Sequence, residues 1–175
     1  STVSARVENN LFRDIKSNGL VLYQTQAAEN DPIVVKDNTF INNHRENVYL
    51  SCGPNGQSGN EPCPGGQLFL ANSVANVKIE NNVIRDGNSV YGTGGIEFSN
   101  SNIKNVRVTG NKIFNNNMWG IYINPNPENI SGIVISKNKV YNNGLLPQYN
   151  GVNIFIPHNG SVVESENCFT PSCTP

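Results

Sequence analysis

A short phrase, in which an asparagine is followed two residues later by Phe, Ile or Val, recurs six times along this chain of 175 residues. The phrases start at Asn10, Asn38, Asn82, Asn111, Asn138 and Asn167, so successive starts are 28, 44, 29, 27 and 29 residues apart. A nearly fixed period in this range is typical of a structural unit that stacks on copies of itself. The repeat therefore constrains the fold more strongly than any local propensity does.

Short segments in which apolar and polar residues alternate lie on both sides of each asparagine. One such segment is Val77-Lys78-Ile79, before Asn82, and another is Ile96-Glu97-Phe98, after it. Period-two alternation predicts half-buried strands. Two or three strands in each repeat, with no helical segment, predict one coil of a right-handed parallel β-helix. We expect an all-β chain of about six coils, forming a single domain over residues 1–175.

The repeated asparagines have a structural explanation. An Asn side chain at a turn tolerates unusual backbone angles, and coils stacked at the strand spacing of about 4.8 Å bring successive amides within hydrogen-bond reach. A second asparagine follows the first by five residues in three coils, at Asn43, Asn116 and Asn143. We expect asparagine ladders that hold the scaffold, and we do not interpret the many asparagines as a sugar-binding signature.

The gap of 44 residues between Asn38 and Asn82 fits one coil plus an insertion. We expect the last strand of that coil at residues 47–50, an insertion loop at about residues 52–66, and a realignment of residues 65–69 with residues 94–98. Residues 167–175 are expected to form a cap on the last coil, whose strand edges would otherwise be open to aggregation.

The chain has four cysteines in two local pairs: Cys52 with Cys63, and Cys168 with Cys173. An even number in such pairs favours two disulfides, and the alternative is free thiols in a cytosolic protein. A zinc site is disfavoured because no Cys-x-x-Cys occurs and because His44 and His158 belong to different repeats. Disulfides favour an extracellular setting, so we expect a secreted protein.

The net charge of −1 at pH 7 gives no general attraction to nucleic acid or to an anionic membrane. No apolar run approaches the roughly 18 residues of a transmembrane helix, and no signal peptide is present. The repeats begin close to Ser1, as expected of a mature or excised module. We expect a monomer with no nucleic-acid or membrane partner, no cofactor and no metal.

The strand after each turn predicts an exposed surface that is suited to sugars. If its Leu, Val, Ile and Phe residues point inward, the intervening residues form an outward row: Val21, Tyr49, Glu97, Tyr122 and Asn153. A second outward row includes Asn124 and Phe155, and Trp119, Tyr91 and Tyr149 are placed to form walls. Aromatic rings pack on sugar rings, and carboxylate, amide and phenol groups bond to sugar hydroxyls. Alternatively, these aromatic residues reflect strand propensity alone, with Trp119 filling a corner.

The groups that catalysis would need are sparse. A calcium-dependent lyase needs an acidic cluster and a basic residue in the groove, but the aspartates are scattered over turns: Asp14, Asp31, Asp37 and Asp86. A glycoside hydrolase needs paired carboxylates, and Glu97 has no acidic neighbour in its row. The Asp-Pro-His signature of an epimerase is absent, since Asp31-Pro32 is followed by Ile33. We therefore expect no catalytic residue, and a surface-turn position for His158.

With this repeat over essentially its whole length, the chain resembles the pectin-lyase-like superfamily of right-handed β-helices. That superfamily includes polysaccharide lyases, glycoside hydrolases, uronate epimerases, phage tailspikes and carbohydrate-binding modules. The short length, the missing catalytic groups and the aromatic row are most similar to the β-helical carbohydrate-binding modules of xylanases, the family-89 type.

The resemblance implies a non-catalytic module that binds a plant cell-wall polysaccharide, xylan or a related hemicellulose. It also implies a covalently linked catalytic domain, a glycoside hydrolase that the module targets to the polysaccharide. One alternative is a polysaccharide lyase or epimerase, or a fragment of one, acting on acidic polysaccharide. Another is the structural β-helix of a fibre or adhesin, for which a trimer or filament is expected.

Overall fold

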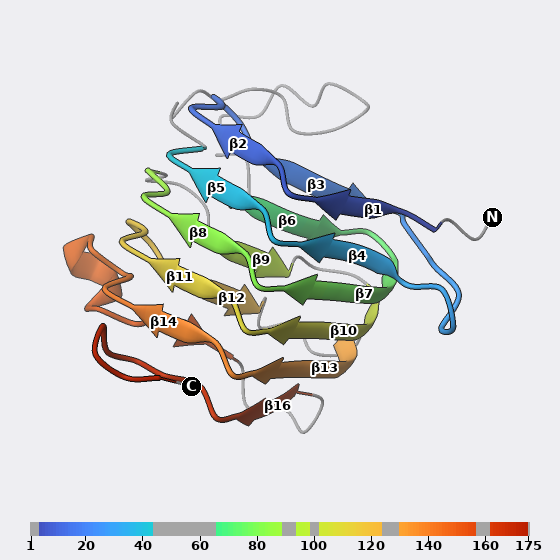
Figure 1. Cartoon of the computed structure of the whole chain (residues 1–175). Helices are drawn as coiled ribbons and strands as arrows, with labels where there is room; N and C mark the ends of the chain where they lie inside the picture. Colours follow the sequence, from blue (N-terminus) through green and yellow to red (C-terminus); the bar gives the residue numbers. More distant parts are fainter. Residues whose placement is uncertain are drawn as a thin grey trace.

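In the computed structural model the chain winds into a parallel β-helix (Figure 1), described for residues 4–43, 66–88, 94–98, 102–123, 130–156 and 162–174. Each coil contributes one strand to each of three parallel sheets, one of six strands and two of five. The predicted β-helix class is confirmed. The described strands make five complete coils and one strand of a sixth, slightly fewer than the six coils that we predicted.

The six-stranded sheet A contains β1 (Arg6–Glu8), β4 (Ile33–Lys36), β7 (Val74–Glu80), β10 (Ile103–Thr109), β13 (Ile130–Ser136) and β16 (Val162–Ser165). Sheet B contains β2 (Leu11–Arg13), β5 (Thr39–Ile41), β8 (Val83–Arg85), β11 (Lys112–Phe114) and β14 (Lys139–Tyr141). Sheet C contains β3 (Leu20–Tyr23), β6 (Leu68–Ala71), β9 (Ile96–Phe98), β12 (Ile121–Ile123) and β15 (Ile154–Phe155). A short 3-10 helix, η2 (Pro147–Tyr149), lies between β14 and β15.

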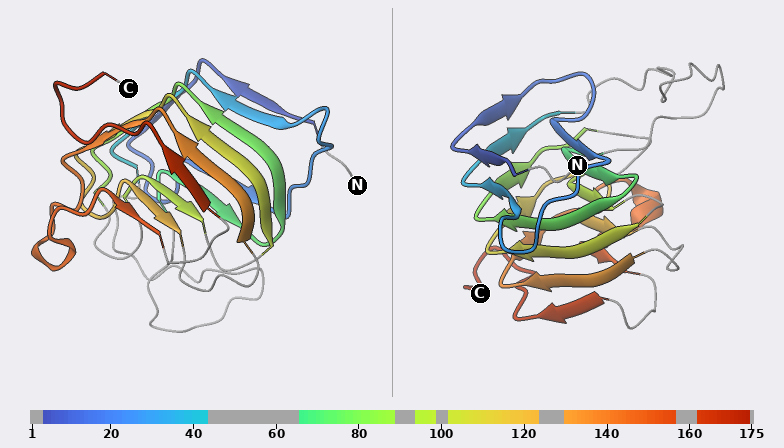
Figure 2. Two further views of the ribbon diagram at one scale, coloured as in Figure 1. Left: turned by 90° about the horizontal axis from the view of Figure 1, so that it is seen from below. Right: turned by 90° about the vertical axis from the view of Figure 1, so that its right-hand side faces the viewer.

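The core fills the space that the three sheets enclose, which is visible end-on in Figure 2. Equivalent apolar residues of successive coils stack on one another, because parallel strands in register place them side by side. In sheet A, for example, Ile79, Val108 and Ile135 lie in one register row, and all three are fully buried. In sheet B the rings of Phe12 and Phe40 stack with their centroids 4.6 Å apart.

The first asparagine of each repeat forms the predicted ladder. The side-chain amide of each donates to the Oδ1 of the next, over 2.9–3.1 Å, from Asn10 through to Asn167. The backbone N–H of each ladder residue donates to the same oxygen. Within the ladder Asn38, Asn82, Asn111 and Asn138 are fully buried. A buried amide is stabilising only when it is bonded, so these residues belong to the scaffold.

We predicted an unusual backbone angle at the ladder asparagine itself. In the structure the residue before the asparagine has this angle. These preceding residues have φ between 53° and 70°: Asn9, Asp37, Asn81, Gly110, Lys137 and Glu166. The left-handed residue turns the chain through the corner between sheets A and B. The next residue, the asparagine, can then point its amide inward.

The second coil differs from the prediction in register. Strand β3 pairs directly with β6, so the last strand of the second coil is Leu68–Ala71 and not residues 47–50. The extra residues therefore precede this strand, and residues 44–65 lie outside the described ranges. Of the segment predicted to align with residues 94–98, residues 66–69 are described, and they align one residue away from the predicted register, because Leu68 pairs with Ile96.

The C-terminal end carries the predicted disulfide between Cys168 and Cys173. Cys168 also extends sheet B, since its N–H donates to Asn138 O over 2.8 Å and its carbonyl accepts from Val140 N over 2.7 Å. The disulfide therefore fastens the last residues beside the edge of the final coil. The other predicted pair, Cys52 with Cys63, lies outside the described residues.

Candidate functional site

Four aromatic side chains gather on the outer face of sheet C, near its C-terminal end. This aromatic patch consists of Trp119, Tyr122, Tyr149 and Phe155. The ring centroids of Trp119 and Tyr122 are 4.5 Å apart and those of Tyr122 and Phe155 are 5.5 Å apart, with the planes within 20° of parallel. Tyr149 meets Trp119 edge-on, at 4.6 Å. Phe155 is 37% exposed, and the other three rings are half-buried.

The register of sheet C explains how two of these rings meet. Tyr122 on β12 lies directly beside Phe155 on β15. Tyr122 points outward because its neighbours Ile121 and Ile123 are fully buried, and Phe155 does so because its neighbours Ile154 and Ile156 pack against the core. Trp119 stands just before β12, where it reaches both rings. The pairing of β12 with β15 therefore positions the Tyr122 and Phe155 rings side by side.

Tyr149 arrives by a different route, from the segment between β14 and β15. Backbone bonds fasten this segment to the preceding coil, from Gly144 N to Met118 O over 2.7 Å and from Leu146 N to Asn117 O over 3.0 Å. The 3-10 turn of η2 then ends at Asn150, which is left-handed with φ of 46°. This turn brings Tyr149 against Trp119.

Glu97 on β9 is the next residue in the register row after Tyr122. It was predicted to be exposed, but it is only 4% exposed, and Phe69 on its other side is 9% exposed. Burial raises the pKa of the Tyr122 phenol, and the nearby charge of Glu97 and the phenol of Tyr149 raise it further. The Tyr122 hydroxyl therefore stays protonated and available as a hydrogen-bond donor well above neutral pH.

We predicted Asn153 to be an outward residue, and this was wrong. Asn153 belongs to the second asparagine ladder. Its Oδ1 accepts from the backbone N–H and the side-chain amide of Asn143, over 3.1 and 3.0 Å. Its carbonyl accepts from Gly120 N and Ile121 N. The prediction failed because η2 lengthens the repeat, which moves Phe155 into the row of Tyr122 where Asn153 was expected.

The remaining predicted site residues divide into two groups. Trp119, Tyr122, Tyr149 and Phe155 come together, and Glu97 lies next to Tyr122 in the register row. Tyr49, Tyr91 and Asn124 lie outside the described residues. The place predicted for Tyr49 in the row, between Val21 and Glu97, is occupied by Phe69. Sequence reasoning missed Phe69 because equal distance from the next strand aligns Phe69 with Phe98, whereas the connection from β6 to β7 is one residue shorter than that from β9 to β10 and Phe69 pairs with Glu97.

The patch presents ring surface together with two phenols, those of Tyr122 and Tyr149, beside the buried carboxylate of Glu97. Because Trp119, Tyr122 and Phe155 stack on one another, the ring faces between them are covered. A ligand could contact only the ring faces and edges that this stacking leaves uncovered. Within the ranges described above, no three His, Cys, Asp or Glu side chains are arranged to hold a metal ion. The patch suits contact with a polyhydroxylated ring, which has both apolar and polar faces.

No protein-family model, no curated protein and no solved structure matches this chain. By its structure the protein belongs to the class of parallel β-helices, with buried asparagine ladders and a disulfide at its C-terminal end. In the part of the chain that the structure describes, no helix is long and apolar enough to cross a membrane.

Proposed function

We propose that this protein is a non-catalytic carbohydrate-binding module that binds a plant cell-wall polysaccharide, xylan or a related hemicellulose, through the aromatic patch. The observation that carries the proposal is the convergence of four rings, from three separate segments of the chain, on one outer face of a parallel sheet. Partly exposed rings held in place by a scaffold suit sugar binding because they lose little conformational freedom when a ligand stacks on them.

The family assignment belongs to the same proposal. We infer that the protein is a member of the pectin-lyase-like superfamily, nearest to the modules of the family-89 type. It would be a secreted monomer that targets a covalently linked glycoside hydrolase to its polysaccharide. The disulfide Cys168–Cys173 supports an extracellular setting, and one carboxylate beside the patch, Glu97, favours binding over hydrolysis, which needs two carboxyl groups.

Affinity electrophoresis and calorimetry on soluble xylan, mixed-linkage glucan, glucomannan and pectin test the proposal. We expect binding to xylan or to a related hemicellulose. Trp119→Ala and Tyr122→Ala should each weaken it by roughly tenfold, the equivalent of about 1.4 kcal/mol, because each removes a contacting ring. Phe114→Ala is the matched control, since Phe114 stacks on Tyr141 in sheet B of the same coil, away from the patch. Failure to bind any of the four polysaccharides sinks the proposal.

A structural role for the patch is the second candidate, and the shared ring faces favour it. Trp119 contacts Tyr122, Tyr149 and Phe155, so it also secures the segment that contains η2 to the coil. In that case Trp119→Ala lowers the melting temperature, and neither the parent protein nor the variant binds glycan. Thermal unfolding of each variant, measured beside its affinity, separates the two roles.

A further inference from the structure

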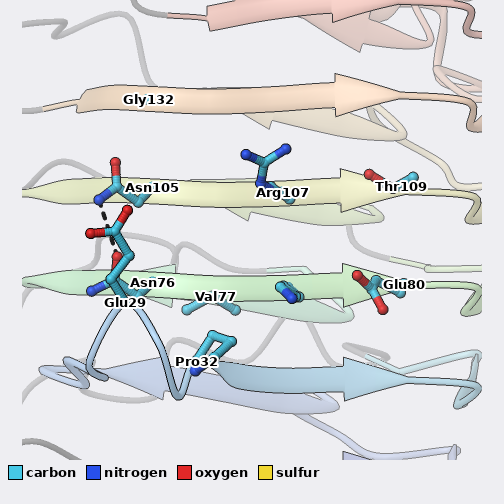
Figure 3. A pocket seen from close by; sticks show the side chains of 10 residues that line it. Glu29, Pro32, Asn76, Val77, Glu80, Asn105, Arg107, Thr109 and Gly132 are labelled. Atoms are coloured by element: carbon cyan, nitrogen blue, oxygen red, sulfur yellow. Dashed lines mark hydrogen bonds between the residues drawn. The ribbon is translucent and has the colours of Figure 1, made fainter.

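A polar groove lies on a different face, across the outer surface of sheet A. It has a volume of about 610 Å³ and is drawn in Figure 3. Its lining comes from β7, β10, the start of β13 and the segment that leads into β4. None of the lining residues belongs to the aromatic patch, which is on sheet C.

One wall of the groove is built by residues 25–32, which the backbone fastens to β7. Ala75 N donates to Thr25 O over 3.0 Å, and Ala27 N donates to Ala75 O over 3.2 Å. A tight turn follows, closed by a bond of 3.1 Å from Asp31 N to Ala28 O. This turn holds Glu29 out in front of β7, where its carboxylate faces the groove (Figure 3).

Amide groups form the end of the groove nearest to Glu29. Asn76 and Asn105 are left-handed residues at equivalent places in β7 and β10, with φ of 59° and 53°. Asn105 Nδ2 donates to Asn76 Oδ1 over 3.0 Å, and Asn76 Nδ2 donates to Ala27 O over 2.7 Å. The equivalent residue of β13 is Gly132, whose absent side chain leaves the Asn105 amide oxygen uncovered. A Cβ there would lie 2.6 Å from that oxygen.

Two cations lie side by side in the middle of the groove. Lys78 and Arg107 are register partners on adjacent strands, at a strand spacing of about 4.8 Å. Like charges in directly opposed positions are unfavourable. In the described residues neither of them belongs to an ion pair. Glu80 and Thr109 form the next register pair on the outer face of the same strands, two residues further along.

We propose that this groove is a second glycan site, which binds a largely neutral sugar chain at a residue that carries one carboxylate. The carboxylate would lie between Lys78 and Arg107, whose charges it satisfies through charge-assisted hydrogen bonds. Sugar hydroxyls on either side would donate to Glu29 and Glu80 and would bond to the Asn105 amide. This site is independent of the aromatic patch, so a negative result at one site does not refute the proposal for the other.

The balance of charge in the groove selects a sparsely acidic ligand. The cations of Lys78 and Arg107 lie between two carboxylates, those of Glu29 and Glu80. These four side chains together have no net charge. A chain with a carboxylate on every sugar would bring its flanking charges against Glu29 and Glu80. A chain with one acidic side group among neutral sugars avoids this repulsion and still gains the central contacts.

Calorimetry with three probes tests the site: a xylo-oligosaccharide with a single glucuronic acid branch, the same oligosaccharide without the branch, and a short polygalacturonate. The variants are Lys78→Gln and Arg107→Gln. Lys104→Gln is the matched control, because Lys104 is exposed on β10, loses the same charge and does not line the groove. All are made in the Tyr122→Ala background, which weakens the aromatic patch.

We expect the branched probe to bind at least about tenfold more tightly than the unbranched one, with the difference shrinking as salt is added. Lys78→Gln and Arg107→Gln should each abolish this preference, and Lys104→Gln should preserve it. Equal affinity for the branched and unbranched probes, or no binding of either, overturns the proposal. So does an equal effect of Lys104→Gln, which indicates diffuse attraction, or tighter binding of polygalacturonate, which indicates a polyanion surface.

Discussion

The side-chain amide of Gln67 donates to the Oδ1 of Asn116 over 3.0 Å, although the two residues are 49 positions apart and one coil intervenes. The intervening coil has Gly87 where the second ladder requires an asparagine. Gln67 fills the place by accepting from Asn43 Nδ2 over 3.1 Å and donating to Arg85 O over 2.8 Å. The second ladder is therefore continuous across a coil that has no asparagine of its own.

Replacing Gln67 with alanine should break this ladder. The substitution removes one side-chain bond from each of the buried amides of Asn43 and Asn116, and a buried polar group that loses a partner costs about 1–3 kcal/mol. We expect Gln67→Ala to lower the free energy of unfolding by about 2–4 kcal/mol in chemical denaturation. Gln148→Ala is the control, since Gln148 is exposed in η2. If both variants are equally stable, the bridge has no energetic role.

Restoring the repeat pattern with Gly87→Asn should destabilise the protein. The repeat suggests asparagine at this position, but a Cβ on Gly87 would lie 2.2 Å from Gly94 O and 2.8 Å from Asn116 Oδ1. We expect a loss of at least about 1–3 kcal/mol, because both neighbours are held by their own coils. Gly151→Asn is the matched control. Gly151 has a φ of 73°, which asparagine tolerates, and a Cβ added there would have no neighbouring atom within 4 Å. Thermal melting of the two variants makes the comparison, and a more stable Gly87→Asn contradicts the structure.

Position along the first ladder should decide how much an asparagine contributes. Asn111 accepts from the backbone and side chain of Asn82 and donates to Ile79 O and to Asn138. Asn10 is exposed at the end of the ladder. We expect Asn111→Ala to cost about 3–5 kcal/mol of unfolding free energy and Asn10→Ala about 1 kcal/mol or less. Equal losses in urea denaturation would show that the amides act singly and not as a ladder.

Glu164 should make stability depend on pH in the acid range. It lies in the register row of the core residues Val108 and Ile135, at the last coil. Burial raises its pKa, so the folded state binds its proton more tightly than the unfolded state does. Its contribution is therefore fully present below the ordinary carboxyl pKa and is lost as the pH rises through the raised value.

Glu164→Gln should accordingly be more stable than the parent at neutral pH, and this advantage should disappear on acidification below the ordinary carboxyl pKa. Denaturation at a series of pH values measures the difference, with Glu166→Gln as the control, because Glu166 is a carboxylate on the same segment that lies outside the register row of the core residues. An advantage that grows on acidification has the wrong sign and refutes the assignment. A charged group in an inward position also blunts the end of a β-helix against edge-to-edge association.

The sequence predicted those features that repeat. The six Asn-x-apolar phrases were sufficient for the β-helix and for the first ladder. The disulfide Cys168–Cys173 followed from its local spacing. These features are set within one coil and copied to the next, so the period alone locates them.

What the sequence did not predict lies where a coil departs from the repeat. The insertion before Leu68 and the η2 segment before Ile154 each shifted the register, and a shift in register changes which side chains face outward. That is why Phe69 and Phe155 replaced Tyr49 and Asn153 in the outward row. The burial of Glu97 and the groove on sheet A depend on neighbours from other coils, and no pattern within a single repeat reports them.

Trp119 is the single tryptophan of the chain, so its fluorescence reports on the aromatic patch alone. The most direct test of the proposed function is a titration with a neutral xylo-oligosaccharide, monitored by tryptophan emission and, in parallel, by calorimetry. We predict a saturable change in emission whose midpoint agrees with the calorimetric affinity and which Tyr122→Ala weakens. Calorimetric binding without any change in the emission of Trp119, or no binding at all, would contradict the assignment of the patch as the glycan site.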